Sequence, residues 1–449
     1  MLRFARTFVA AALMLPALTV TATVPEAQAQ TIQRVVSPSG IVAWLIRDTS
    51  VPLVAMEVSF AGGGVLDPAG REGLSRLATG LLDEGAGERD DQAYASALED
   101  LSARLGFGST LDSASVSLRA LSETFGSAVD LAVDALVAPR FDAAAIERVR
   151  RQVLVGLQRE QEDPATMANR AFFRDAFGTH PYARGSRGTP QAIAAVTRDD
   201  LLAWTRAQFT RDAMTIGVAG DITPEALANL LEASFGRLPA TGTRPPVTTA
   251  TVAAPAGVRI IDMQVPQSTV VFGHQGIARS DPDWYAATVV NYILGGGGFT
   301  SRLTEEVREK RGLTYGISTG LAGFQHANLL MGQSQTDNAS AAEVVRLITG
   351  VWRSLATDGP TDAEVEGAKS WLTGSFPLRM DSTASIARLL VGLQLDGLGQ
   401  DYLERRTSLI AAVTPADVRR VAARLLTTDQ LSVVIAGRPV GITAGPLPR

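Results

Sequence analysis

Short segments in which apolar and polar residues alternate recur along the chain, and this period of two predicts β-strands. The segments are residues 43–47, 51–60, 113–121, 268–277, 312–321 and 328–337. Longer segments with apolar residues three and four positions apart predict helices. These lie near 73–84, from about 123 to 177, and at 283–294, 341–356 and 362–376. Because strands precede helices in each part of the chain, we expect an α+β fold.

One long segment of the sequence occurs twice. IAAVTRDDLLAWTRAQFTRDAMTIGVAGD begins at Ile193 and IAAVTPADVRRVAARLLTTDQLSVVIAGR at Ile410, with a constant offset of 217 residues. Each copy predicts a capped helix, a short turn and an apolar strand that ends in Ala-Gly. Asp199 or Asp200, and Asp417 in the second copy, lie early in the helix, where a carboxylate suits the helix dipole. The repeat therefore predicts two homologous halves.

Residues 237–256, RLPATGTRPPVTTATVAAPA, separate the two halves and lack helical or strand periodicity. Their Pro, Thr and Ala content is typical of a linker. We expect each half to form a mostly antiparallel sheet with helices packed on one face, and the two halves to form a two-domain shell. The predicted parts are a signal peptide at 1–29, an N-terminal domain at 30–240, a linker at 241–256 and a C-terminal domain at 257–449.

The start of the chain is typical of a secretory signal peptide. Arg3 and Arg6 precede an apolar run at 8–20, and Ala27-Gln28-Ala29 provides a small-x-small cleavage site. No later segment has the roughly 18 uninterrupted apolar residues of a transmembrane helix. We therefore expect a periplasmic or secreted protein without a membrane anchor. Because the chain has no cysteine, its core must stabilise it without disulfides.

Charge and histidine content exclude several function classes. With 41 basic and 46 acidic residues, the chain is a poor candidate for binding nucleic acid or an anionic membrane. No two of its three histidines, His180, His274 and His326, stand four residues apart, so a helical zinc-ligand pair is absent from the sequence. His180, in Thr-His-Pro-Tyr, is predicted to be a structural turn residue. The acidic run at 83–91 lacks calcium-loop spacing and is predicted to be a solvated loop.

The segment GREGLSRLATGLLDEGAG, residues 70–87, predicts an amphipathic helix. Its apolar positions are Leu74, Leu77, Ala78, Leu81 and Leu82, and its other face carries Arg76, Thr79, Gly80 and Asp83. An interior glycine costs a helix about 1 kcal/mol relative to alanine. We therefore expect a packing reason for Gly80.

This segment resembles the zinc-binding helix of the pitrilysin/insulinase-type zinc peptidases, which include the mitochondrial processing peptidases. Their His-x-x-Glu-His signature lies within G-L-A-H-F-L-E-H, and the aligned residues here are G-L-S-R-L-A-T-G. Arg76, Thr79 and Gly80 stand at the three signature positions, and the family's further glutamate ligand falls at Gly156 or Leu157. The resemblance extends over nearly the whole mature chain and departs at the zinc site. It implies a chain without zinc of its own.

The stretch EVREKRGLTYGISTG, residues 305–319, permits two interpretations. In the first, Arg308 and its basic neighbours occupy the last turn of a helix, Gly312 caps it, and Tyr315 is an ordinary strand aromatic. In the second, Arg308 and Tyr315 match the pattern R-x-K-x-x-L-x-Y of the resembled family. The resemblance then implies that this pair donates to the substrate or to the oxyanion of a tetrahedral intermediate.

Four consecutive glycines, Gly295, Gly296, Gly297 and Gly298, follow an apolar helical segment. A phosphate-binding loop would need a strand before the glycines and a lysine near their end, but no lysine occurs until Lys310. Two interpretations stay open. The glycines form a flexible connection between helices, or, as the resemblance implies, a mobile substrate-binding loop.

Taken with the resemblance, these residues predict the non-catalytic subunit of a heterodimeric, exported zinc peptidase. Zinc and the intact signature are expected on a homologous partner chain, while Arg308 and Tyr315 act in trans on a peptide substrate. The chain alone is then inactive. The alternative is a catalytically silent scaffold or peptide-binding protein of the same fold, in which the pair is a remnant.

Overall fold

The computed structural model describes residues 31–448, which form one compact unit. The predicted signal peptide, residues 1–29, lies outside these described residues. Within the described part, no helix has the length and apolar character needed to cross a membrane.

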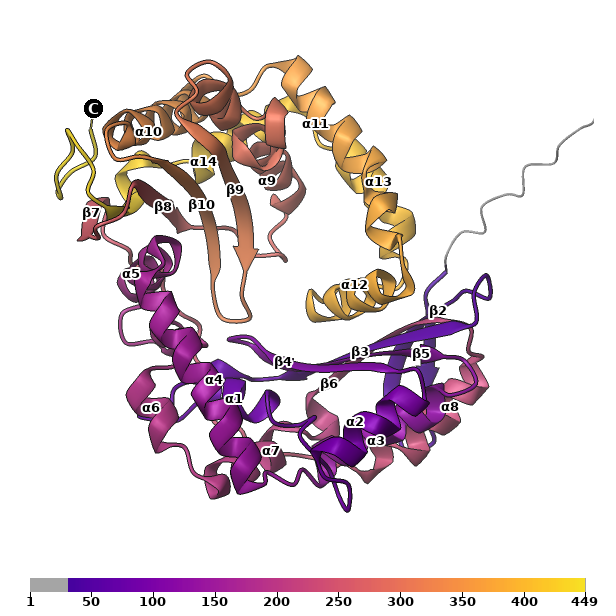
Figure 1. Ribbon diagram of the computed structural model, residues 1–449. Helices are drawn as coiled ribbons and strands as arrows, with labels where there is room; N and C mark the ends of the chain where they lie inside the picture. Colours follow the sequence, from indigo (N-terminus) through magenta and orange to yellow (C-terminus); the bar gives the residue numbers. More distant parts are fainter. Residues whose placement is uncertain (1–30, 449) are drawn as a thin grey trace, which may run out of the picture. The chain divides into compact units, whose positions relative to one another are not determined.

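The first half of the chain forms a six-stranded sheet in the order β1-β2-β6-β3-β5-β4 (Figure 1). Its strands are β1 (Gln33–Val36), β2 (Val42–Arg47), β3 (Leu53–Ala61), β4 (Arg104–Ser109), β5 (Ser113–Leu121) and β6 (Met214–Gly220). β2 and β6 pair in parallel, whereas the other neighbouring pairs are antiparallel. In this register Val58 lies opposite Val116 on one side and Ile216 on the other.

The second half forms a five-stranded sheet in the order β7-β11-β8-β10-β9. Its strands are β7 (Gly257–Asp262), β8 (Gln267–Gln275), β9 (Thr314–Gly323), β10 (Asn328–Asp337) and β11 (Ser432–Gly437). β11 pairs in parallel with β7 and antiparallel with β8, as β6 does with β2 and β3. The predicted α+β class, with two homologous and mostly antiparallel sheets, is confirmed.

Helices cover one face of each sheet. In the first half these are α1 (Leu74–Thr79), α2 (Asp91–Asp100), α3 (Phe125–Val137), α4 (Ala143–Glu162), α6 (Pro190–Ala195), α7 (Arg198–Gln208) and α8 (Pro224–Ala233). In the second half they are α9 (Trp284–Asn291), α10 (Ala341–Thr357), α11 (Asp362–Gly374), α13 (Tyr402–Ala411) and α14 (Pro415–Leu425). Apart from α13, which packs on α9 and α11, their apolar sides close a separate core in each half.

The sequence repeat corresponds to a structural repeat. α7 begins after Thr197 and α14 after Thr414, and each threonine forms a capping box with the aspartate three residues later, Asp200 or Asp417. Both helices are followed by a short 3₁₀ turn and then by a central strand. Identical local signals therefore place equivalent elements at the same position in both sheets.

The other face of each sheet is covered by a helix from the opposite half. α5 (Pro164–Phe177) packs on β8 and β11, and α12 (Thr383–Leu395) packs on β3 and β6. Phe172 is buried with Val434 in the first of these contacts. Leu390 is buried with Ala219 in the second. Because of this exchange, the central strands are buried on both faces, which explains why they are apolar throughout.

The approach of α12 to the first sheet is close at Gly217. A Cβ atom there would lie 2.2 Å from the carbonyl oxygen of Ala387 on α12. Beside it, Gln394 Nε2 donates to the carbonyl oxygen of Ile216 at 2.9 Å. The absence of a side chain at Gly217 is therefore a condition for seating α12.

The amphipathic helix predicted over 70–87 is shorter than expected. α1 ends at Thr79, whose hydroxyl donates back to the carbonyl oxygen of Ser75 at 2.9 Å. Gly80 follows as the C-terminal residue of the helix, because glycine is a poor helix former. Leu81 and Leu82 are fully buried although they lie in turns. The apolar pattern thus predicted burial correctly and helix length wrongly.

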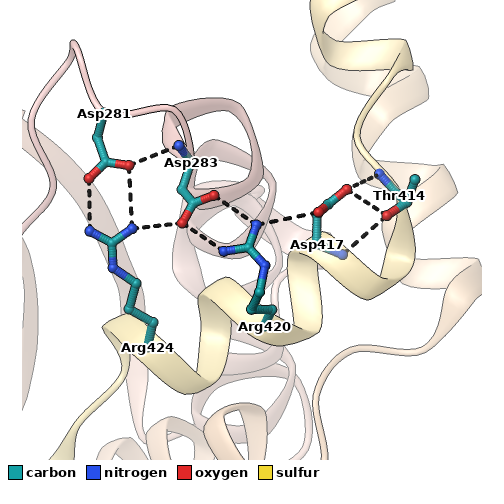
Figure 2. Close-up of polar contacts among 6 residues, drawn as sticks. All are labelled: Asp281, Asp283, Thr414, Asp417, Arg420 and Arg424. Carbon is teal, nitrogen blue, oxygen red and sulfur yellow. Dashed lines mark hydrogen bonds and ion pairs between the residues drawn. The ribbon is translucent and has the colours of Figure 1, made fainter.

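A charged network fixes α14 beside the start of α9 (Figure 2). Arg420 donates twice to the Asp283 carboxylate, both at 2.8 Å. Arg424 bridges Asp283 at 2.6 Å and Asp281 at 2.8 Å. Hydrogen bonds from Arg420 hold the pKa of Asp283 down at about 2. Asp417 links this network to the capping box, since it also accepts from Arg420.

We expect Gly217→Ala to lower the free energy of unfolding by about 1–3 kcal/mol, because the added methyl group meets the backbone of α12. The matched control is Gly367→Ala, in the exposed interior of α11, where a Cβ atom meets nothing within 4 Å. That change should raise stability by roughly 0.5–1 kcal/mol. Urea unfolding of both variants provides the measurement. Equal effects in the two proteins would contradict the close packing.

We expect Asp283→Asn to cost about 1 kcal/mol at pH 7, a modest value because water screens the network. The folded-state pKa lies below the ordinary value of 3.8, so the carboxylate stabilises the folded protein above about pH 4. That contribution is lost as the pH falls toward 2. The unfolding free energies of native protein and variant should therefore converge between about pH 4 and pH 2. A difference that stays constant across this range would rule out Asp283 as its source.

Candidate functional site

Arg76, Thr79 and Gly80, the three signature positions, line one pocket of about 830 Å³. The pocket lies where α1 and α4 meet the end of β4. Its remaining walls come from the turn after β4, the loop containing Arg187, and the tip of the β9–β10 hairpin at Phe324. The structure therefore gathers the three positions into one concave site.

Each of the three signature positions is in contact with other parts of the protein. The Thr79 hydroxyl donates to the backbone of α1, and Gly80 packs against Val149 on α4. A Cβ atom at Gly156 would lie 3.8 Å from Arg76 Nη2, so the guanidinium extends over this glycine. Gly156, one of the two predicted positions of the further glutamate ligand, therefore lies beside Arg76. A Cβ atom at Gly80 would lie 3.6 Å from Val149, an ordinary contact distance, so packing on α4 does not require glycine there.

A buried carboxylate, Glu160, organises the arginines at the back of the pocket. Arg187 Nη1 donates to Glu160 Oε1 at 2.5 Å, and Arg170 Nη2 donates to Oε2 at 3.2 Å. Arg76 Nη1 completes the cluster at 3.5 Å from Oε1. The side chain of Glu160 is only 10% exposed. Sequence reasoning missed Glu160, although its position one helical turn after Gly156 was a usable signal.

The start of α1 is anchored by a second buried carboxylate that the sequence did not reveal. Asp67 accepts from the backbone N–H groups of Gly73 at 2.8 Å and Ser75 at 3.0 Å. Burial raises the pKa of Asp67 to about 7, although the donated hydrogen bonds oppose this shift. These bonds fix the helix that carries Arg76.

The residues of this site do not fit a zinc ion. A zinc site needs imidazole, thiolate or carboxylate ligands that converge on one point. Here the signature positions hold a guanidinium, a hydroxyl and a glycine, and the nearby carboxylate is bound by three cations. Over residues 31–448, no group of three histidine, cysteine, aspartate or glutamate side chains is arranged to hold a metal.

Arg308 and Tyr315 lie away from this pocket. Neither residue lines the pocket. Gly323 does line it, and Tyr315 stands eight residues before Gly323 on the same strand. At the rise of an extended strand, Tyr315 and Gly323 are roughly 26 Å apart along β9. Tyr315 is 90% exposed. The Arg308 guanidinium lies 4.4 Å from the ring centroid of Phe299, and its Nε is 3.6 Å from Glu309. The pair is therefore accessible from outside the chain.

Residues 305–319 also contain a helix end capped by Gly312, as the first of the two interpretations predicts. Gly312 has a φ of 63° and donates to the carbonyl oxygen of Arg308 at 2.8 Å. Lys310 and Arg311 both bond to Glu306. The preceding turn, Thr304–Glu309, is π-helical. Local capping thus accounts for Gly312, Lys310 and Arg311, but it does not use the side chains of Arg308 or Tyr315.

The four glycines continue α9 as a π-helical turn, Tyr292–Gly296, followed by a 3₁₀ turn. A Cβ atom at Gly295 would lie 2.7 Å from the Thr319 hydroxyl on β9, and one at Gly297 would lie 2.8 Å from the Tyr292 ring. Close packing therefore explains these two glycines without a ligand. The next residue, Phe299, is the one that stacks under Arg308, so the glycine segment and the Arg308 region adjoin.

His180 lies in a structural turn, as its sequence context predicts. Its Nδ1 accepts from the backbone N–H of Tyr182 at 3.2 Å, and its Nε2 donates to the carbonyl oxygen of Thr248 at 3.0 Å. The ring thereby ties the turn at 180–184 to the segment before β7.

Family comparisons agree with this arrangement of the two halves. Residues 42–189 match the model described as insulinase (peptidase family M16), and residues 195–372 match the peptidase M16 inactive domain. An uncharacterised zinc protease of Mycobacterium tuberculosis is 30% identical over 302 residues, which cover 67% of this chain and 69% of that protein. The chain belongs to the insulinase family, peptidase family M16. It is a member of the inactive type, because the zinc signature is replaced at Arg76, Thr79 and Gly80.

Other M16 relatives include both non-peptidases and subunits. A non-peptidase homolog of Helicobacter pylori is 26% identical over 336 residues, covering 75% of this chain and 77% of its own. The mitochondrial-processing peptidase subunit beta of Neurospora crassa is 24% identical over 407 residues, covering 82% and 80%. A crystal structure of a peptidase M16 inactive domain from Pseudomonas fluorescens superposes with a TM-score of 0.85 at 29% identity, covering 93% of this chain and 100% of that one.

We expect this M16 chain, purified and passed through a metal-free column after exposure to zinc, to retain far less than one zinc per molecule. The reason is that the positive cluster around Arg76 repels a divalent cation and supplies no set of ligands. Elemental analysis by mass spectrometry provides the measurement. One zinc per chain that survives the column and is removed only by a chelator would contradict this reading of the pocket.

Proposed function

We propose that this chain is the non-catalytic subunit of an exported, heterodimeric zinc peptidase. In this proposal a homologous partner carries the zinc and the intact signature. Arg308 and Tyr315 then act across the interface on a peptide bound to the partner.

The exposure of Tyr315 is the observation that carries the proposal. A phenol that served only to pack a strand would be covered, yet 90% of this residue is accessible. The pair also stands far from the chain's own altered signature positions, which line the pocket at the other end of β9. Donors placed in this way suit a substrate held by another molecule.

The chemistry of the two side chains supports the same proposal. Peptide hydrolysis develops negative charge on the former carbonyl oxygen, and donors aimed at that charge lower the barrier. A guanidinium stays charged at every physiological pH, and a phenol donates one directed hydrogen bond. Removing one such donor typically costs about 2.7–4 kcal/mol of transition-state stabilisation.

Two further findings support a two-chain enzyme. The residues around Arg76 do not fit zinc, so a metal for this chemistry is expected on the partner chain. The relative from Neurospora crassa is itself described as a subunit of a processing peptidase. The sequence at 1–29 adds the expectation that the complex works in the periplasm or outside the cell.

A second candidate is a catalytically silent scaffold or peptide-binding protein of the same fold. It is favoured by the open edge of the first sheet. Among residues 31–448, β4 pairs only with β5, so its outer backbone groups can accept an extended peptide. In this case Arg308 and Tyr315 would be remnants.

The deciding experiment is a peptide-cleavage assay on this chain, on a zinc-bearing M16 partner, and on their mixture. We expect cleavage only in the mixture. Arg308→Ala and Tyr315→Phe should each lower kcat/KM by about 10²–10³-fold, because each removes one donor to the developing charge.

Arg353→Ala provides the matched control, since Arg353 is exposed on α10 in the same half and is not placed in the site. It should leave the activity of the mixture unchanged. If the partner alone is fully active, or if the Arg308 and Tyr315 variants behave like the control, the scaffold role replaces the subunit role.

A further inference from the structure

The cluster behind the altered signature holds more positive than negative charge. Three guanidiniums, those of Arg76, Arg170 and Arg187, surround the single carboxylate of Glu160. Within residues 31–448, none of the three arginines forms a second ion pair. Each guanidinium has five N–H donors, so most donors in this cluster are not used by Glu160.

Two of these arginines face the pocket directly. Arg76 and Arg187 line it, and their side chains are 32% and 57% exposed, so a ligand can reach them. Glu160, at 10% exposure, is covered behind them. The pocket therefore presents the positive side of the cluster.

The other carboxylates near the pocket are engaged elsewhere. Asp112, which lines the wall formed by the β4–β5 turn, accepts from the Tyr182 hydroxyl and from the backbone N–H of Gln325 at 3.0 Å. Asp163 caps α5 and accepts from Thr166. Neither is hydrogen-bonded to the arginines, so neither satisfies the guanidinium donors that Glu160 leaves unused. Hydrogen bonds from Thr166, with a smaller contribution from the charge of Arg187, lower the pKa of Asp163, so Asp163 offsets only part of the positive charge.

We propose that this pocket binds a carboxylate of an acidic peptide, held by Arg76 and Arg187 at the position where catalytic relatives carry metal ligands. The site concerns this chain alone and does not depend on a partner. At the positions that match the zinc signature, this chain thus carries an anion site.

We favour a carboxylate over other anions because the three arginines already bind the carboxylate of Glu160. Arg187 and Arg76 both approach Oε1 of Glu160, which shows that their guanidiniums are positioned for this group. The rest of the lining favours a peptide over a free ion. Phe107 and Phe324 supply apolar walls, and the volume of about 830 Å³ accommodates several residues. Phe107 also belongs to β4, the strand whose outer edge is open.

The test uses three synthetic peptides and isothermal titration of the full mature chain. The first is acetyl-Ala-Ala-Leu-Glu-Leu-Ala-Ala-amide, the second carries Gln in place of Glu, and the third is the Gln peptide with a free C-terminal carboxylate. At low ionic strength we expect a charged peptide to bind about tenfold more tightly than the neutral one. The preference should shrink in 0.5 M salt. Tight binding of the first peptide would identify a side-chain carboxylate as the ligand. Tight binding of the third peptide would identify a C-terminal carboxylate.

Three variants locate the binding. Arg187→Gln and Arg76→Gln should abolish the tenfold preference. Arg151→Gln, on the exposed face of α4 and outside the pocket, changes the net charge equally and should leave the preference intact. Glu160→Gln should strengthen binding of the charged peptide severalfold, because it removes the competing negative charge while keeping an amide oxygen as acceptor.

Circular dichroism and thermal unfolding establish that each variant is folded. Equal affinity for all three peptides, or no binding of any peptide at millimolar concentration, would overturn the proposal. So would a preference that survives Arg187→Gln and Arg76→Gln, or one that Arg151→Gln removes as well.

Discussion

The structure depends on one packing constraint, the need of each sheet to cover two apolar faces. Strand β8 is buried at seven consecutive positions and β11 at all six, a pattern that only a sheet covered on both sides can satisfy. Helices of the same half cover one face. The second face is closed by α5 on one sheet and by α12 on the other. The halves are thereby linked by buried apolar contacts as well as by their linker.

This exchange also builds the pocket. α4 ends at Glu162, and α5 leaves at once toward the second sheet, so the turn between them holds Glu160 beside Arg170. The loop after α5 then returns Arg187 to the same carboxylate. The charges at the altered signature are therefore fixed by the elements that hold the two halves together.

The side chains at the three signature positions decide which kind of ion this pocket can bind. The backbone places a helix, a concave pocket and an open strand edge side by side in the first half. Arg76 and two glycines convert the field of the site from one suited to a cation into one suited to an anion. Arg308 and Tyr315, at the far end of β9, are unaffected by that conversion because they belong to a different surface.

The sequence by itself determined what depends on local chemistry. It predicted β5 and β10 at their observed bounds, both helices of the repeat and the glycine cap after Arg308. It predicted too long a helix at 70–87, because periodicity reports burial and not helical hydrogen bonding. Only the tertiary structure decided that α5 and α12 exchange sheets and that Arg187 reaches Glu160. Such contacts join residues far apart in sequence, so no local pattern specifies them.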